Sequence, residues 1–206
     1  MEVNPENLVL FLVLEGKENK GSSYQWHKSR GVEVPHIDYE QEAMICINAW
    51  RSMGGIYKDI TIYVINPTRN AISQESRKEL KSYNAEYMHV YMEEIDQFEC
   101  SWFNVAICGK WLEETLCKDK HIMHIDLDMW LLKEPTKELM TLDPDLMVKV
   151  GVYDECNIHD KRSIVREYPT NAVTCLMLSH ASKKFYTHWH NLNVLEAGKI
   201  ADPREN

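Results

Sequence analysis

Apolar runs alternate with amphipathic segments along the first two thirds of the chain. Short apolar runs without Gly or Pro are typical of buried strands, whereas apolar residues three or four positions apart indicate helices. We therefore expect strands over residues 8–14, 60–65, 87–92 and 122–125. Helices are expected over residues 40–53, 73–83 and 101–116, with Gly54 ending the first and Ser101 capping the third. This alternation predicts an α/β fold with a mostly parallel central sheet flanked by helices.

The last third of the chain has a less regular pattern. Strands are expected over residues 146–153 and 172–178, joined by a polar stretch that contains Arg162 and Arg166. A final helix is expected over residues 183–197, ended by Gly198. No internal repeat or linker is evident, so we expect a single domain over residues 1–206 that changes character near residue 128. The polar end of the sequence leads us to expect that this domain is part of a longer protein.

Composition and charge narrow the class of protein. Of the 206 residues, 44% are hydrophobic and 27% are charged, as in globular proteins. The net charge of −9 disfavours nucleic acid and anionic membrane surfaces as partners. The longest apolar run, residues 8–14, is too short to span a bilayer, so we expect no membrane insertion. Six cysteines without a C-x-x-C pair indicate a reduced protein, and we expect a cytoplasmic location.

Two carboxylates end the fourth expected strand, in the sequence Asp126-Leu127-Asp128. Residues two apart in an extended chain point to the same side, so Asp126 and Asp128 can face one ligand. The carboxyl ends of strands are where open α/β sheets bind ligands, and a divalent cation would relieve the repulsion between the two charges. The same spacing recurs at Asp143 and Asp145, but it surrounds a proline and follows no apolar strand, which indicates a turn. For the first pair, the alternative is that both residues only cap the next segment.

The segment between the first strand and the first helix, residues 16–31, is unusually long and basic. Lys28 and Arg30 could close over an anionic ligand as part of a lid, although a solvated loop with incidental charge is the alternative. Gly16 could let a ligand approach the backbone closely, or it could be an ordinary turn glycine.

Other polar residues are expected at the same edge of the sheet. Asn66 closes the second strand, and its amide could pair with a base edge, although a turn residue before Pro67 is the favoured alternative. Trp102 and Asn104 lie near the start of a helix, where they could face a sugar or phosphates; Trp102 is more often a core residue.

Late carboxylates and histidines complete the candidates. Asp154 and Glu155 could serve as a general base or stabilise charge, with a solvated strand end as the equal alternative. His188 or His190 in the last helix could supply a third metal ligand, against the favoured alternative of an ordinary surface or core histidine. There is no H-E-x-x-H, zinc-finger, G-x-G-x-x-G or Walker motif.

The motif and its context resemble the GT-A class of nucleotide-sugar glycosyltransferases. The resemblance rests on the stretch from Ile125 to Pro135, at the end of the fourth expected strand. This stretch contains an apolar residue, the Asp-x-Asp motif, further apolar residues and a proline. The later Thr170-Asn171-Ala172-Val173 is similar to an Asn-Ala/Ser-Gly-apolar element of these enzymes, with Val173 in place of the Gly. The whole sequence also resembles the amino-terminal glycosyltransferase domain of a larger chlorella-virus protein that helps build capsid glycans.

This resemblance implies a GT-A fold and a metal-dependent glycosyltransferase that uses Mn²⁺ or Mg²⁺. It implies transfer from a UDP-sugar to an oligosaccharide or glycoprotein acceptor, with retention of configuration and possible rhamnosyl transfer, in the host cytoplasm if the protein is viral. The regular pattern of the first half and the irregular pattern of the second predict, independently of the resemblance, that residues 1–128 form a nucleotide-binding half and residues 129–206 an acceptor-side half. Together, the sequence positions and the resemblance give the following candidate residues: metal ligands Asp126, Asp128 and His190; catalytic Asp126, Asp128 and Asp154; donor-binding Leu14, Gly16, Asn66, Trp102, Asn104, Asp126 and Leu127; acceptor-side Glu155 and Asn171.

Two other functions compete with this one. Phosphotransferases with an aspartate nucleophile also carry Asp-x-Asp after a strand, but there the strand is normally the first and a Thr or Val follows the motif, where this chain has Trp130. The second alternative is a nucleotide-sugar-binding domain without catalytic activity.

Overall fold

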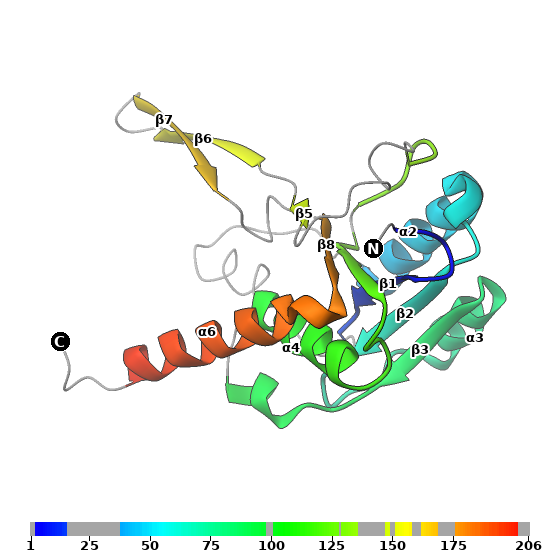
Figure 1. Ribbon diagram of the computed structural model, residues 1–206, viewed down its shortest axis with the longest axis horizontal. Helices are drawn as coiled ribbons and strands as arrows, with labels where there is room; N and C mark the ends of the chain where they lie inside the picture. The colour runs from blue at the N-terminus through cyan, green and yellow to red at the C-terminus, as the bar shows by residue number, and fades with distance from the viewer. Residues whose placement is uncertain are drawn as a thin grey trace.

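The computed structural model describes residues 3–15, 38–97, 101–127, 129–135, 147–148, 151–157, 162–168 and 176–201 (Figure 1). Within these ranges, no helix is both long and apolar enough to cross a membrane.

A six-stranded sheet forms the centre of the protein, with the strand order β3-β2-β1-β4-β8-β5. Strands β1 (Leu8–Val13), β2 (Thr61–Asn66), β3 (Ala85–His89) and β4 (His121–Ile125) are parallel. Strand β8 (Leu176–His180) runs antiparallel to β4 and pairs on its other side with β5 (Met147–Val148). Strands β6 (Gly151–Asn157) and β7 (Arg162–Tyr168) form a separate antiparallel pair. The predicted fold class, a mostly parallel sheet flanked by helices, is confirmed.

Helices cover both faces of the sheet (Figure 1). On one face lie α2 (Tyr39–Met53) and α3 (Gln74–Ser82), and on the other lie α4 (Ser101–Glu114) and α6 (Phe185–Ala201). Three short 3₁₀ segments, η1 (Gly55–Tyr57), η2 (Glu93–Gln97) and η3 (Ala181–Lys183), connect these elements.

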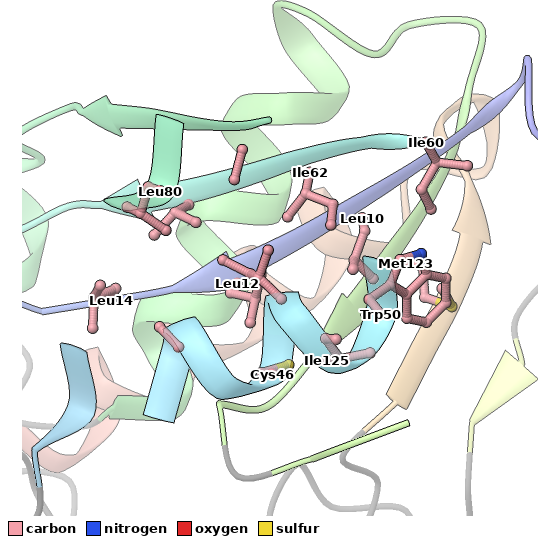
Figure 2. Packing of buried hydrophobic residues seen from close by; sticks show 14 of the residues in the cluster. Leu10, Leu12, Leu14, Cys46, Trp50, Ile60, Ile62, Leu80, Met123 and Ile125 are labelled. Atoms are coloured by element: carbon pink, nitrogen blue, oxygen red, sulfur yellow. The ribbon is translucent and has the colours of Figure 1, made fainter. Parts of the chain in front are cut away.

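Side-chain alternation along β1 builds two buried clusters. Leu10 and Leu12 point to the α2 side, where they lie near Trp50 (Figure 2). Ile47 of α2 belongs to the same buried cluster. Phe11 points to the opposite side, with the core residues of α4 and α6. A strand buried on both faces needs apolar residues at every position, which explains the uninterrupted apolar run of β1.

Two buried glutamates connect neighbouring helices. Glu40 in the first turn of α2 accepts a hydrogen bond from the Ser73 hydroxyl at 2.8 Å and another from the Ser76 hydroxyl, so it holds α2 to the amino terminus of α3. Glu113 of α4 accepts hydrogen bonds from the backbone N–H groups of Tyr186 (3.0 Å) and Thr187 (2.9 Å) at the start of α6. The Glu113 carboxylate therefore accepts from backbone N–H groups that have no partner within their own helix, whereas Glu40 binds serine hydroxyls at the start of α3.

The structure corrects several predicted boundaries. Strand β3 begins before residue 87, because Asn84 adopts a left-handed turn (φ 53°) directly after α3 and the chain enters the sheet at Ala85. The polar stretch around Arg166 was expected to be a connection, yet residues 162–168 form β7, whose backbone pairs with β6. Gly198 does not end α6, since a glycine costs an established helix only about 1 kcal/mol.

The remaining predicted elements match more closely. Helix α2 ends at Met53 with Gly54 as its C-cap, as expected. Ser101 was predicted to be the cap of α4 and is instead its first residue. The predicted strand over residues 146–153 is divided between β5 and β6.

Candidate functional site

The carboxyl ends of β1 and β4 lie side by side in the middle of the sheet. After β1 the chain adds β2 and β3 on one side, whereas β4 pairs with the other side of β1. This reversal of strand order makes a topological switch point, where open α/β sheets bind ligands in the crevice beyond the strand ends. Leu14 and Glu15 follow β1 at this point, and Asp126 follows β4.

Asp126 is partly accessible, with 26% of its side chain exposed. His124, two residues earlier on β4, lies on the same side, with its Nε2 atom 3.6 Å from Asp126 Oδ1. Burial lowers the pKa of His124 to about 3, so its imidazole is neutral at neutral pH and the contact is not an ion pair. His124 therefore adds no positive charge beside Asp126.

The backbone turns directly after β4. The Asp126 carbonyl accepts a hydrogen bond from the Met129 N–H group at 3.1 Å, a spacing of three residues that is typical of a tight turn. Leu127 is half-buried and packs against the cluster on the α2 side of the sheet. Asp128, the second carboxylate of the pair, lies outside the described residues.

The donor atoms at the end of β4 bear on which metal ion could bind there. Within the described ranges, no group of three or more His, Cys, Asp or Glu side chains could hold a metal ion. Asp126 does offer a partly accessible carboxylate oxygen, and Mg²⁺ is usually bound by one or two carboxylates together with substrate phosphates and water. This oxygen donor fits Mg²⁺ or Mn²⁺ better than Zn²⁺, which favours nitrogen and sulfur ligands.

Asn104, in the first turn of α4, reaches the carboxyl end of β1. Its Nδ2 donates a hydrogen bond to Glu15 Oε1. Its Oδ1 is buried and has no hydrogen-bond partner in the described part of the chain. A buried acceptor without a donor is costly, so Asn104 Oδ1 is a natural place for a ligand N–H or O–H group. Trp102 lies in the same helical turn, placed by its backbone alone.

Two other predicted donor-side residues are engaged within the fold. The Leu14 side chain is fully buried in the core, so any contact with a ligand would fall to its backbone. Asn66 Oδ1 accepts from the N–H (2.9 Å) and hydroxyl (2.7 Å) groups of Thr68, and Nδ2 donates to the Asn70 carbonyl (2.8 Å) and the Tyr87 hydroxyl (3.2 Å). These four bonds use every polar atom of the Asn66 side chain, as in the turn interpretation.

His190 is on α6, and its ring lies near Lys110 of α4 and Glu94 of η2. Its ring is buried, with Nε2 3.3 Å from Glu94 Oε2 and Nδ1 3.4 Å from Lys110 Nζ. His188 is exposed. The metal-ligand role of His190 stays a prediction, and the contacts described for its ring are with Glu94, Lys110 and Asn191.

The remaining predicted residues lie on β6 or outside the described residues. Asp154 and Glu155 lie on β6, where their backbones pair with Val165 and Ile164 of β7. The predicted lid residues Lys28 and Arg30, together with Gly16 and Asn171, fall outside the described residues.

Two residues near the switch point were not identified from the sequence: Glu15, and Cys46, whose Sγ atom lies 3.1 Å from the Met129 carbonyl oxygen. Glu15 is an acidic residue directly after a buried strand, the same signal that identified Asp126, but it stands alone in the sequence without a paired carboxylate. Cys46 lies in the middle of a predicted helix and carries no such signal.

No protein-family model and no curated protein matches this chain. Similar solved structures include the galactosyltransferase LgtC in complex with donor and acceptor sugar analogs (13% identity, TM-score 0.49). They also include the apo form of the glycosyltransferase GlyE of Streptococcus pneumoniae TIGR4 (11%, 0.46) and mouse xyloside xylosyltransferase 1 (9%, 0.44).

In that order, the three structures cover 89%, 96% and 89% of this chain. This chain spans 59%, 39% and 71% of the length of the three proteins. All three are glycosyltransferases, the class of enzyme that the sequence resembles.

Proposed function

We propose that this chain is a metal-dependent glycosyltransferase that moves a sugar from a UDP-sugar to an oligosaccharide or glycoprotein acceptor. The observation that carries the proposal is the position of Asp126, a partly exposed carboxylate at the carboxyl end of β4, at the switch point beside β1. The Asp-x-Asp motif around it, followed by apolar residues and Pro135, supports this function through its resemblance to GT-A enzymes.

The metal site is the chemical centre of this proposal. Asp126 and Asp128 would hold Mn²⁺ or Mg²⁺, with His190 as the proposed third ligand. When bound, the ion supplies a Lewis acid that screens the donor diphosphate and the charge developing on the leaving nucleotide.

The donor nucleotide would lie across the ends of β1 and β4. Asn104 Oδ1 is buried and has no described partner, so it can accept a hydrogen bond from a ribose hydroxyl or a base N–H group. Glu15 accepts from Asn104 Nδ2 and thereby orients the amide. The other donor-side residues of the proposal are Leu14, Gly16, Asn66, Trp102 and Leu127.

The sequence resemblance supports two finer features, transfer with retention and rhamnosyl transfer in viral capsid glycan synthesis. The length and basic charge of residues 16–31 support a lid that contains Lys28 and Arg30, and the change of pattern along the chain supports a division near residue 128. Asp154 would take part in catalysis, and Glu155 and Asn171 would face the acceptor.

The test combines binding and turnover. Thermal-shift measurements with a panel of UDP-sugars, with and without Mn²⁺, should show metal-dependent stabilisation, because a ligand that binds the native state raises its melting temperature. With the donor so identified, Asp126→Asn and Asp128→Asn should abolish Mn²⁺-dependent sugar transfer. The matched control is Asp143→Asn in the second Asp-x-Asp sequence, which should keep wild-type activity.

Each result has a defined meaning. Full activity in Asp128→Asn would refute the proposal. Donor binding without transfer or donor hydrolysis would identify a nucleotide-sugar-binding domain instead of an enzyme. The anomeric configuration of the product, measured by NMR, decides between retention and inversion.

A further inference from the structure

The thiol of Cys46 lies against the backbone turn that carries Asp126. Cys46 is on the inner face of α2 (Figure 2) and only 1% exposed. Its Sγ atom is 3.1 Å from the Met129 carbonyl oxygen and 3.9 Å from the Asp126 carbonyl oxygen. A thiol has one proton, so it donates to the nearer carbonyl, that of Met129, and contacts the other by packing.

These contacts close a small cluster of main-chain and side-chain groups. The Met129 N–H group donates to the Asp126 carbonyl, and the Cys46 thiol contacts the carbonyl groups of both residues. The same two residues flank the second carboxylate of the pair in the sequence. Helix α2 thus restrains the turn after β4 at both of its ends.

A restrained turn matters for a metal site, because the direction of an Asp carboxylate depends on the backbone that carries it. Residues around metal ligands contribute to affinity by fixing the orientation of those ligands before the ion binds. The adjacent Asp126 side chain has His124 on one side, and its backbone has Cys46 on the α2 side. The restraint therefore acts on the main chain and leaves the Asp126 side chain accessible.

We propose that Cys46 is a positioning residue that holds the Asp126–Met129 turn in its metal-binding form. This inference rests on the proposed function. It adds a requirement that the motif does not contain, a hydrogen-bond donor on α2 at position 46.

The test measures Mn²⁺ affinity in the presence of UDP, by the EPR signal of free Mn²⁺, for the wild-type chain and three variants. Cys46→Ser and Cys46→Ala leave side chains of nearly equal size, and only serine keeps a donor. Cys117→Ala is the matched control, because Cys117 is a buried thiol in the cluster on the opposite face of the sheet. Thermal unfolding of each variant without metal reports any general loss of stability.

We expect Cys46→Ala to bind Mn²⁺ about three- to tenfold more weakly, the factor that one ordinary hydrogen bond represents. Cys46→Ser should restore affinity to within about twofold of the wild type, because its hydroxyl can replace the thiol as a donor. Cys117→Ala should lose stability and keep wild-type affinity.

The outcomes separate this inference from the proposed function. Wild-type affinity in Cys46→Ala, or equal weakening in the Ala and Ser variants, would overturn the positioning role and leave the proposed function standing. Absence of Mn²⁺ binding by the wild-type chain with UDP would overturn both.

Discussion

Replacement of Glu113 tests how α6 is held against the rest of the protein. Glu113 is fully buried near the end of α4. Its carboxylate accepts hydrogen bonds from the Tyr186 N–H group (3.0 Å), the Thr187 N–H group (2.9 Å) and the Thr187 hydroxyl (2.6 Å). In Glu113→Ala these three donors lose their acceptor at the buried start of α6.

The expected loss of stability follows from these three bonds. A hydrogen bond to a charged group contributes roughly 1.5–3 kcal/mol, and loss of a helix N-cap costs about 1 kcal/mol and at most about 2 kcal/mol. The sum of the three bonds overstates the loss, because the alanine variant no longer buries a charge and water can enter the space left behind. We therefore expect Glu113→Ala to lower the free energy of unfolding by about 3 kcal/mol.

In a chain of this length, a loss of about 3 kcal/mol lowers the melting temperature by roughly 6–12 °C. Circular dichroism or calorimetry would measure this shift. The matched control is Glu114→Ala, since Glu114 is the next residue on α4 and is exposed, and its loss should change stability by about 0.5 kcal/mol or less. Equal melting temperatures for the two variants would refute the role given to the Glu113 carboxylate.

Three further predictions concern packing and titration. Gly109→Ala should destabilise the protein by roughly 1–3 kcal/mol in urea unfolding, because the added Cβ would lie 2.3 Å from the buried Tyr186 ring. Glu40→Ala should lower the free energy of unfolding by about 2 kcal/mol and the melting temperature by several degrees, since it removes the buried carboxylate that accepts from the Ser73 hydroxyl. Burial raises the pKa of the Cys117 thiol from 9.0 to about 11, so the unfolded state releases this proton first and stability should fall as pH rises from 9 to 11. Cys117→Ala should show a smaller fall in urea midpoint over that pH interval.

The elements that the sequence predicted best are those whose pattern depends only on burial. Strand β1 is apolar at every position because helices cover both of its faces, and such a run is visible without knowledge of its neighbours. Strand β7 was missed for the opposite reason. Residues 162–168 contain charged side chains, and their strand conformation follows from backbone pairing with β6, which the composition of the segment does not reveal.

The same distinction applies to the candidate site. Asp126 could be predicted because its position depends on one local fact, that it directly follows a buried strand. The contacts around it join distant parts of the chain: Asn104 and Glu15 are 89 residues apart, and Cys46 and Met129 are 83 residues apart. Both contacts need β4 to pair with β1 rather than with β3, which precedes it in the chain. Strand order is a long-range property of the sheet, so sequence patterns identified Asp126 at the end of β4 but not the side chains that the fold places around it.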